Sequence, residues 1–267
     1  MGTRSDRHGA DRVVEMPQLP ISGIEVTLRQ PAGGEDLMLS EAVRYDTSLA
    51  LALVNRLASP SRDWSQLCVT DLEALLLLIR RDVLGDEIRT DASCGVRDCG
   101  ARVDISFRVE KYLGHHRPRV ARGVEREGEG EWFRFADNAA RFRIPTAADV
   151  VATASTQDPE IELLRRCVVP VPVLSRVRCR VETALEALAP GLSHAVHGEC
   201  KQCRAQISVY FDVQEFVLRE LRSRAASIYR DIHLLASRYQ WPEESILALP
   251  CARRMHYAAM IADGGSL

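Results

Sequence analysis

Two pairs of cysteines, about a hundred residues apart, carry the clearest chemical signal in the chain. Cys94 and Cys99 enclose four residues, and Cys200 and Cys203 enclose two. Cysteine pairs at such short spacings are typical zinc ligands, and a structural zinc takes four nitrogen or sulfur ligands in a tetrahedron. Because neither pair completes such a site alone, we expect all four cysteines to converge on one zinc. Four thiolates leave no position open for water or substrate, so this zinc would be structural.

Two alternatives for these thiols stay open. Histidines close in sequence could complete separate metal sites, His197 with the second pair, or His115 and His116 with the first. Alternatively, the thiols are buried without a metal, because the spacing of the first pair is wider than in a standard zinc ribbon.

No catalytic constellation is recognisable. The sequence has no phosphate-binding or dinucleotide-binding glycine loop, no GxSxG elbow and no HExxH helix. The remaining cysteines have no histidine in a recognisable local partnership, and we interpret them as small buried or half-buried residues: Cys68, Cys167, Cys179 and Cys251. We therefore predict a protein that is not an enzyme and has no small-molecule substrate.

The segment after each cysteine pair has the pattern of a half-buried strand. Aligned from Cys99 and Cys203, the two segments match without a gap for fourteen residues. Apolar residues recur at every second position, which is the period of a strand, and an aromatic residue follows in register. The matched pairs are Ala101 and Ala205, Val103 and Ile207, Ile105 and Val209, Phe107 and Phe211, Val109 and Val213, and Tyr112 and Phe216. We predict that these two apolar faces are buried by packing together.

A weaker repeat lies upstream of the cysteines. Both copies have an alternating strand, an arginine, a proline two residues later, and an acidic residue that opens a helix. The corresponding residues are Arg29 and Arg143, Pro31 and Pro145 and, after one inserted residue in the first copy, Asp36 and Asp149. Thr146 and Asp149 form an approximate capping box. Helical segments then lead to each cysteine pair.

These patterns predict an α+β fold with an internal duplication. Two strand-helix-knuckle-strand modules, residues 21–113 and 131–218, are expected to be joined by the four-cysteine site. Residues 1–20 are polar and charged, which predicts a disordered tail and not a signal peptide. Residues 114–130 are rich in glycine, arginine and glutamate, and we expect a mobile linker. In that linker the glutamates are expected to cancel the charge of Arg117, Arg119 and Arg122.

Residues 219–267 are expected to form a helical appendage that occurs only once. Its helix carries an apolar seam with alternating spacings of three and four: Leu218, Leu221, Ala225, Ile228, Ile232, Leu235 and Tyr239. The seam either packs on the rest of the chain or offers a stripe to a partner helix. A turn at Trp241 precedes the last helix, where Arg253, Arg254 and Tyr257 are expected on an exposed face. We predict that these four residues contact a protein partner.

Composition excludes several classes of partner. The net charge is −2 and the isoelectric point is near 6.4, so the chain has no global attraction for nucleic acid or for an anionic membrane. The longest apolar run, residues 72–79, is too short to span a bilayer. Clustered cysteines without an export signal predict a reducing, cytoplasmic location.

Several stretches of the C-terminal half resemble the baseplate hub assembly proteins of contractile phage tails and of phage-like injection systems. They read RFRIPTAADV, CKQCRAQISVYFDVQEFVLREL and IHLLASRYQWPEESILALPCARRMHYAAMI, and the likeness covers about residues 142–261. The first module matches more loosely, through IEVTLRQPAGGED. The resemblance implies a non-enzymatic chaperone or accessory component with protein partners in a tail or baseplate assembly, either cytoplasmic or incorporated into a tail-like particle.

A zinc-ribbon module that binds nucleic acid or regulates transcription is the alternative function. Such a module needs a basic face with exposed aromatic residues. The slightly acidic net charge of −2 and an aromatic content of 6% count against it.

Overall fold

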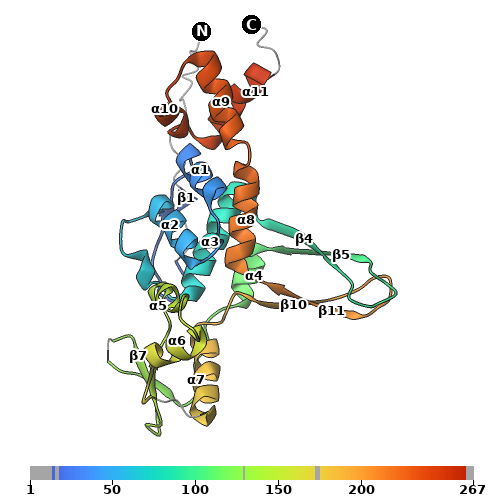
Figure 1. Cartoon of the computed structure of the whole chain (residues 1–267). Helices are drawn as coiled ribbons and strands as arrows, with labels where there is room; N and C mark the ends of the chain where they lie inside the picture. The colour runs from blue at the N-terminus through green and yellow to red at the C-terminus, as the bar shows by residue number, and fades with distance from the viewer. Residues whose placement is uncertain (1–13, 16–17, 129, 172–174, 263–267) are drawn as a thin grey trace, which may run out of the picture.

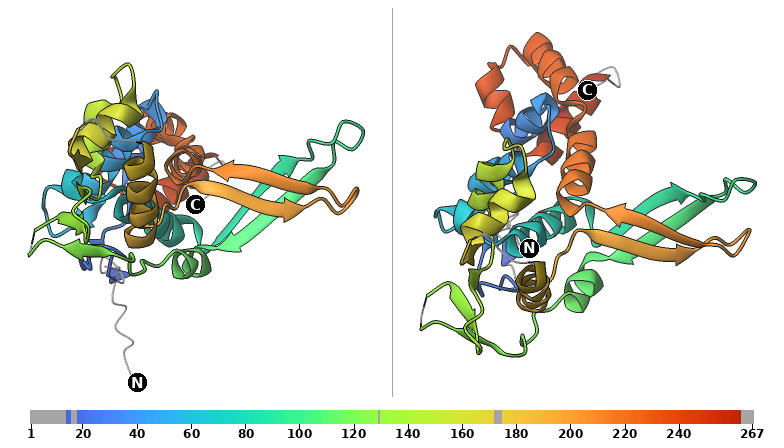
Figure 2. Two further views of the ribbon diagram at one scale, coloured as in Figure 1. Left: turned by 90° about the horizontal axis from the view of Figure 1, so that it is seen from below. Right: turned by 60° about the horizontal axis from the view of Figure 1, so that its bottom comes forward.

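A computed structural model describes residues 14–15, 18–128, 130–171 and 175–262. The fold mixes helix (49%) with strand (19%). A central body carries a smaller lobe at one end and a group of helices at the other, while two long hairpins project sideways as an arm (Figures 1 and 2). Among the described helices, none combines the length and apolar character needed to cross a bilayer.

The central body is built around one almost completely buried helix, α3 (Val69–Leu84). The apolar residues of its leucine-rich stretch, 72–79, are at most 2% exposed, which explains why the sequence shows apolar residues on every side of this helix. Around α3 pack the helices α1 (Gly33–Glu41), α2 (Thr47–Leu57), α4 (Val109–His115) and α8 (Val213–Ala225), and the short 3₁₀ helix η1 (Trp64–Gln66).

A small antiparallel sheet completes this body. It has the strand order β1 (Val14–Glu15), β2 (Thr27–Leu28) and β3 (Ala58–Ser59). Most of the disordered tail predicted at residues 1–20 lies outside the described residues. The described part is not a loose tail, because β1 pairs with β2 and Leu19 is only 2% exposed.

The smaller lobe has its own sheet and its own core. The sheet is antiparallel, in the order β6 (Val124–Arg126), β7 (Trp132–Phe135), β8 (Arg141–Arg143) and β9 (Val168–Val169). The helices are α5 (Ala147–Thr153), α6 (Pro159–Cys167) and α7 (Ser175–Leu188). Phe142 and Val181 lie fully buried between sheet and helices.

The segment predicted as a mobile linker, residues 114–130, is instead tied to this lobe. Strand β6 lies within it and pairs with β7. Ala121 is buried in the lobe's core, and the backbone N–H of Arg119 donates to the carbonyl of Ala187 in α7 at 2.6 Å. The linker was predicted from its low content of apolar residues. Composition does not reveal this anchoring, because one buried alanine and backbone hydrogen bonds are sufficient to hold the segment.

The capping box predicted at the start of α5 is confirmed. The Thr146 hydroxyl accepts from the backbone N–H of Asp149, and the Asp149 carboxylate accepts from the backbone N–H of Thr146 at 3.0 Å. Arg143 donates to the same carboxylate through two nitrogens, at 2.6 and 2.8 Å. This hydrogen bond from Arg143 outweighs the effect of burial and holds the pKa of Asp149 well below its usual range.

The first turn of helix α1 has a similar network, formed by Glu35, which the sequence alignment did not identify. Arg29 donates to the Glu35 carboxylate at 2.7 Å, and that carboxylate accepts from the backbone N–H of Ala32 at 2.9 Å. Glu35 follows Arg29 by six residues, as Asp149 follows Arg143. The predicted insertion before Asp36 is therefore wrong, because Glu35 and not Asp36 forms the pair with the arginine.

Replacing Asp149 by asparagine is expected to lower the free energy of unfolding at pH 7 by about 2 kcal/mol, because a charged hydrogen-bond network is lost. The folded-state pKa of Asp149 is depressed, so its contribution is present above the unfolded value of 3.8 and is lost as pH falls below it. Urea unfolding of both proteins should therefore show a difference that shrinks below about pH 4. A difference that stays constant down to about pH 2 would contradict this assignment.

The C-terminal helices differ from the single long helix predicted for the seam. Helix α8 ends at Ala225, and α9 (Ile228–Tyr239) begins after a two-residue break. Leu218 and Leu221 pack into the main core, so α8 belongs to the central body and crosses the predicted boundary at residue 219. The interpretation in which the seam packs on its own chain therefore holds for α8. The appendage consists of α9, α10 (Glu243–Leu247) and α11 (Cys251–Ala262).

The arm consists of two antiparallel hairpins. Strand β4 (Glu87–Ser93) pairs with β5 (Arg102–Arg108) along its whole length, and β10 (His194–Glu199) pairs with β11 (Gln206–Phe211). The predicted strands after each cysteine pair are thus confirmed as β5 and β11. Both hairpins leave the body in the same direction, and each carries one cysteine pair at its tip (Figure 2).

Candidate metal centre

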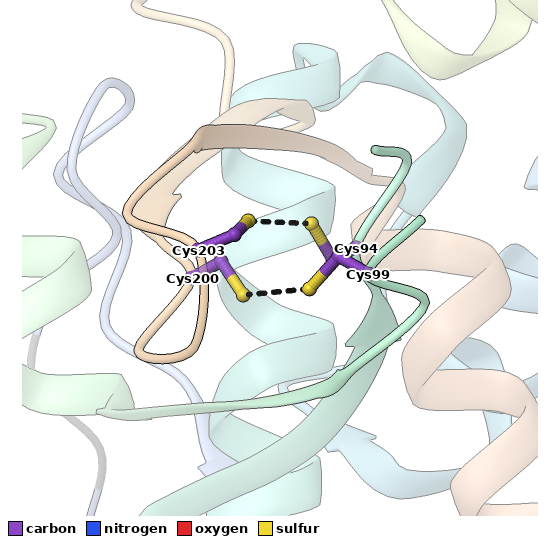
Figure 3. A group of neighbouring side chains, drawn as sticks. All are labelled: Cys94, Cys99, Cys200 and Cys203. Carbon is purple, nitrogen blue, oxygen red and sulfur yellow. Dashed lines mark hydrogen bonds between the residues drawn. The ribbon is translucent and has the colours of Figure 1, made fainter. Parts of the chain in front are cut away.

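The two hairpin tips turn in the same way despite their different lengths. The backbone N–H of Cys94 donates to the carbonyl of Ala101 at 2.8 Å, and that of Cys200 donates to Ala205 at 2.9 Å. The residue after the second cysteine is left-handed in both tips, with φ of +56° at Gly100 and +61° at Arg204. Glycine adopts this conformation without strain, and an arginine adopts it at a cost. Figure 3 shows that both cysteines of each tip point towards the opposite tip.

The four cysteine side chains converge between the tips. The Sγ atoms of Cys94 and Cys203 are 3.6 Å apart, and those of Cys99 and Cys200 are 3.8 Å apart (Figure 3). All four Sγ atoms lie within 4.8 Å of one another. A tetrahedron with zinc–sulfur bonds of 2.3 Å has edges of about 3.8 Å. The predicted convergence is confirmed, and the cluster is close enough to hold a metal ion.

A small apolar cluster surrounds the sulfurs. Cys94 and Cys200 are buried, at 4% and 0% exposure, while Cys203 is exposed. Val103 and Ile207 pack beneath them, separately from the cores of the central body and of the smaller lobe. The tip of the arm therefore has little apolar surface with which to hold the hairpins together without a further cross-link.

The thiols differ in how readily they ionise. The backbone N–H groups of Cys203 and Gln202 donate to the Cys200 sulfur and lower the pKa of Cys200 to about 7. A backbone hydrogen bond from Ala101 acts in the same direction at Cys99, but burial and the neighbouring thiols raise the pKa of Cys99 to about 12. Four thiolates this close repel one another, and a bound cation removes that repulsion.

The histidines lie elsewhere, so separate sites with one cysteine pair each are not formed. Of all the described residues, only the four cysteines make a group of metal-binding side chains close enough to share an ion. His197 is exposed on β10. His115 and His116 lie at the end of α4, where the ring of His116 is 4.6 Å from that of His194.

Aromatic rings close the base of the arm. Phe107 of β5 and Phe211 of β11 meet at 5.3 Å, and Tyr112 stacks on Phe107 at 5.0 Å. The Tyr112 hydroxyl donates to the carbonyl of Leu192, and it lies 3.1 Å from His194 Nδ1. The predicted packing of the two apolar faces therefore occurs at both ends of the arm. Tyr112 was identified from the sequence only as an aromatic residue in register with Phe216, and its polar contacts were not predicted.

Three of the four residues predicted to contact a partner remain on the surface of the appendage. The Trp241 ring lies 5.6 Å from that of Tyr257 and 5.1 Å from that of Tyr239, and Arg253 is exposed. The prediction for Arg254 is wrong, because this residue is only 1% exposed. Its guanidinium turns inward to two carboxylates, of Asp36 at 2.5 Å and of Asp231 at 3.1 Å.

Comparison of the chain with protein-family models, with curated proteins and with solved structures found no match.

Proposed function

We propose that the chain is a non-enzymatic assembly chaperone, or an accessory structural component, of the baseplate of a contractile tail or injection system. A structural zinc held by Cys94, Cys99, Cys200 and Cys203 stabilises it. The observation that carries the structural, non-enzymatic part of this proposal is the four-thiol cluster, whose Sγ atoms all lie within 4.8 Å of one another at the tips of a projecting arm. The baseplate role is supported by the resemblance of residues 142–261 to hub assembly proteins. Such a site stiffens a binding element and leaves no position for a substrate.

The ligand set favours a soft metal ion such as zinc over calcium and magnesium. Thiolates are soft ligands that suit zinc in a tetrahedral arrangement, whereas calcium and magnesium take oxygen ligands. The bound metal would neutralise the thiolates and cross-link the two hairpins. The residues of the chain supply the ligands, the backbone N–H groups that stabilise them, and the small apolar cluster beneath.

We further propose that the two halves of the chain descend from one duplicated module. Each half contains, in the same order, a short strand, two helices, a second short strand, a longer helix, a cysteine-tipped hairpin and a closing helix. An arginine pairs with an acidic residue six positions later at the start of each half, Arg29 with Glu35 and Arg143 with Asp149. Under this proposal each copy supplies half of the zinc ligands.

The aromatic surface of the appendage is proposed as the contact with the partner protein. It is formed by Tyr239, Trp241 and Tyr257, with Arg253 beside them, and excludes the buried Arg254. Aromatic residues and arginine are enriched at protein interfaces. Aromatic side chains offer large contact areas with few rotamers to fix, and arginine offers a planar group with several hydrogen-bond donors.

Co-purification with the hub components of a contractile baseplate tests this role. The full chain should retain a hub component, and Trp241→Ala combined with Arg253→Ala should lower the recovered partner by about tenfold. The matched control is Arg165→Ala, which removes an exposed charge from the smaller lobe. The proposal fails if the unmodified chain retains no hub component, or if the double variant retains as much as the control.

A further inference from the structure

A cleft on the smaller lobe lies between α7 and the segment that leads into β6. Its volume is about 630 Å³, which is within the range of pockets that bind ligands. Three of its lining residues, Ala121, Phe135 and Ala184, are buried members of the lobe's core and give the cleft an apolar floor. Cys179 lines the cleft as well, and its thiol is exposed.

Three arginines line this cleft, and two of them are not neutralised. Arg180 is paired with Asp137 through two hydrogen bonds of 2.9 and 3.2 Å, and its guanidinium lies 4.3 Å from the centre of the Phe135 ring. Arg122 and Arg176 are exposed, and neither forms an ion pair with any residue that the structure describes. The cleft therefore combines an apolar floor with excess positive charge.

The glutamates that were expected to neutralise these arginines form ion pairs with other arginines. Glu125 pairs with Arg134 at 3.1 Å, and Glu127 pairs with Arg141 at 2.6 Å. Both pairs lie along the sheet of the smaller lobe. The predicted cancellation of the charges in residues 117–122 by the glutamates that follow is therefore wrong for these two carboxylates.

The position of Arg176 strengthens the attraction for an anion. Helix α7 begins at Ser175, and its first turn contains no acidic residue. The N-terminus of a helix carries a partial positive charge, so a cation there is unfavourable unless an anion lies close by. A bound carboxylate would relieve this repulsion as well as pair with the arginine.

We propose that this cleft binds an acidic segment of a protein partner. Carboxylates of the segment pair with Arg122 and Arg176, and an apolar side chain rests on the floor formed by Ala121, Phe135 and Ala184. Arginine suits this role because its planar guanidinium binds a carboxylate through two parallel hydrogen bonds. The apolar floor favours a peptide over nucleic acid, whose backbone offers charge without an aliphatic side chain. This site is separate from the metal centre and does not depend on the baseplate role.

Fluorescence anisotropy with a labelled peptide of alternating glutamate and leucine tests the proposal on the full chain. We expect saturable binding that weakens by about tenfold or more in Arg122→Ala/Arg176→Ala. Binding should weaken less in Arg122→Lys/Arg176→Lys, which keeps both charges but loses the paired hydrogen bonds of the guanidinium. The matched control, Arg165→Ala/Arg204→Ala, removes two exposed arginines from other surfaces and should bind as the unmodified chain does.

Alkylation of Cys179 by iodoacetamide, followed by mass spectrometry, places the peptide in the cleft. Bound peptide should slow this alkylation, and Cys179→Trp should block binding while leaving every arginine in place. Four results would overturn the proposal: no binding to the unmodified chain, equal binding to the double alanine variant, equal binding of a lysine–leucine peptide, or displacement by single-stranded DNA at matched charge. The last result would indicate a general polyanion surface.

Discussion

Replacing Cys200 by serine is expected to abolish metal binding and to separate the two hairpin tips, while the central body stays folded. Cys200 is fully buried between the tips, and its sulfur lies 3.8 Å from that of Cys99. Zinc bound by four ligands contributes about 10–16 kcal/mol in small zinc-finger peptides, so the loss of one thiolate has a large effect on the arm. The main core contains none of the four cysteines, so its packing does not depend on them.

Metal analysis and hydrogen exchange measure this effect together. The unmodified chain should carry about one zinc, the variant almost none, and amide protection in β4, β5, β10 and β11 should fall only in the variant. Cys179→Ser is the matched control, because that thiol is exposed and lies outside the cluster. Metal-free unmodified protein, or a Cys200→Ser variant that still carries a full equivalent of zinc, would rule out the proposed centre.

Replacing Arg254 by methionine is expected to detach the appendage from the body. The guanidinium joins Asp36 of α1 to Asp231 of α9, and the side chains of these two residues are only 1% and 6% exposed. Burial by itself lowers the pKa of Arg254, but the hydrogen bond and the charge of Asp36 outweigh it and keep the pKa above its usual value. Removing the cation leaves the Asp36 carboxylate with only the longer ion pair to Arg224, at 3.6 Å, and the Asp231 carboxylate with only the Ser227 hydroxyl, at 3.2 Å. Breaking a buried ion pair in this way costs about 3–5 kcal/mol.

Urea unfolding followed by tryptophan fluorescence in a Trp64→Phe/Trp132→Phe background reports on this contact, because the one remaining tryptophan, Trp241, lies in the appendage. Arg253→Met should change stability by less than about 0.5 kcal/mol, since that neighbour is exposed. Adding Asp36→Asn and Asp231→Asn to Arg254→Met should restore part of the lost stability, because no buried charge remains. An Arg254→Met protein as stable as Arg253→Met would show that the buried ion pairs contribute nothing.

Local patterns predicted the convergence of the four cysteines and much of the secondary structure. Cysteine spacing and the two-residue period after Cys99 and Cys203 are properties of short segments, so they specify the hairpins and their inner faces directly. The helix start at Thr146 was predicted correctly for the same reason, because a capping box lies within four residues.

The features that were predicted wrongly depend on contacts between residues far apart in the sequence, or on how neighbouring elements pack. Arg254 is buried because it pairs with Asp36, which lies 218 residues away, and the helix that carries it gave no sign of this contact. The seam was predicted to continue through Ala225 and Ile228 because heptad spacing does not detect a break between two helices. The glutamates after Arg122 were assigned to the wrong arginines, since sequence proximity does not indicate which neighbour a strand brings close.

The clustered thiols also have a consequence for the unfolded chain. Cys99 and Cys200 are 101 residues apart, and every strand and helix of the smaller lobe lies between them. A metal bound at the tips would close this stretch into a ring. In a chain-entropy treatment, a cross-link that closes about 100 residues removes disorder from the unfolded state worth about 4.7 kcal/mol at 25 °C. With this cross-link, the two ends of the lobe would stay close together even when the lobe is unfolded. The unfolded lobe would then have fewer conformations to sample before it refolds.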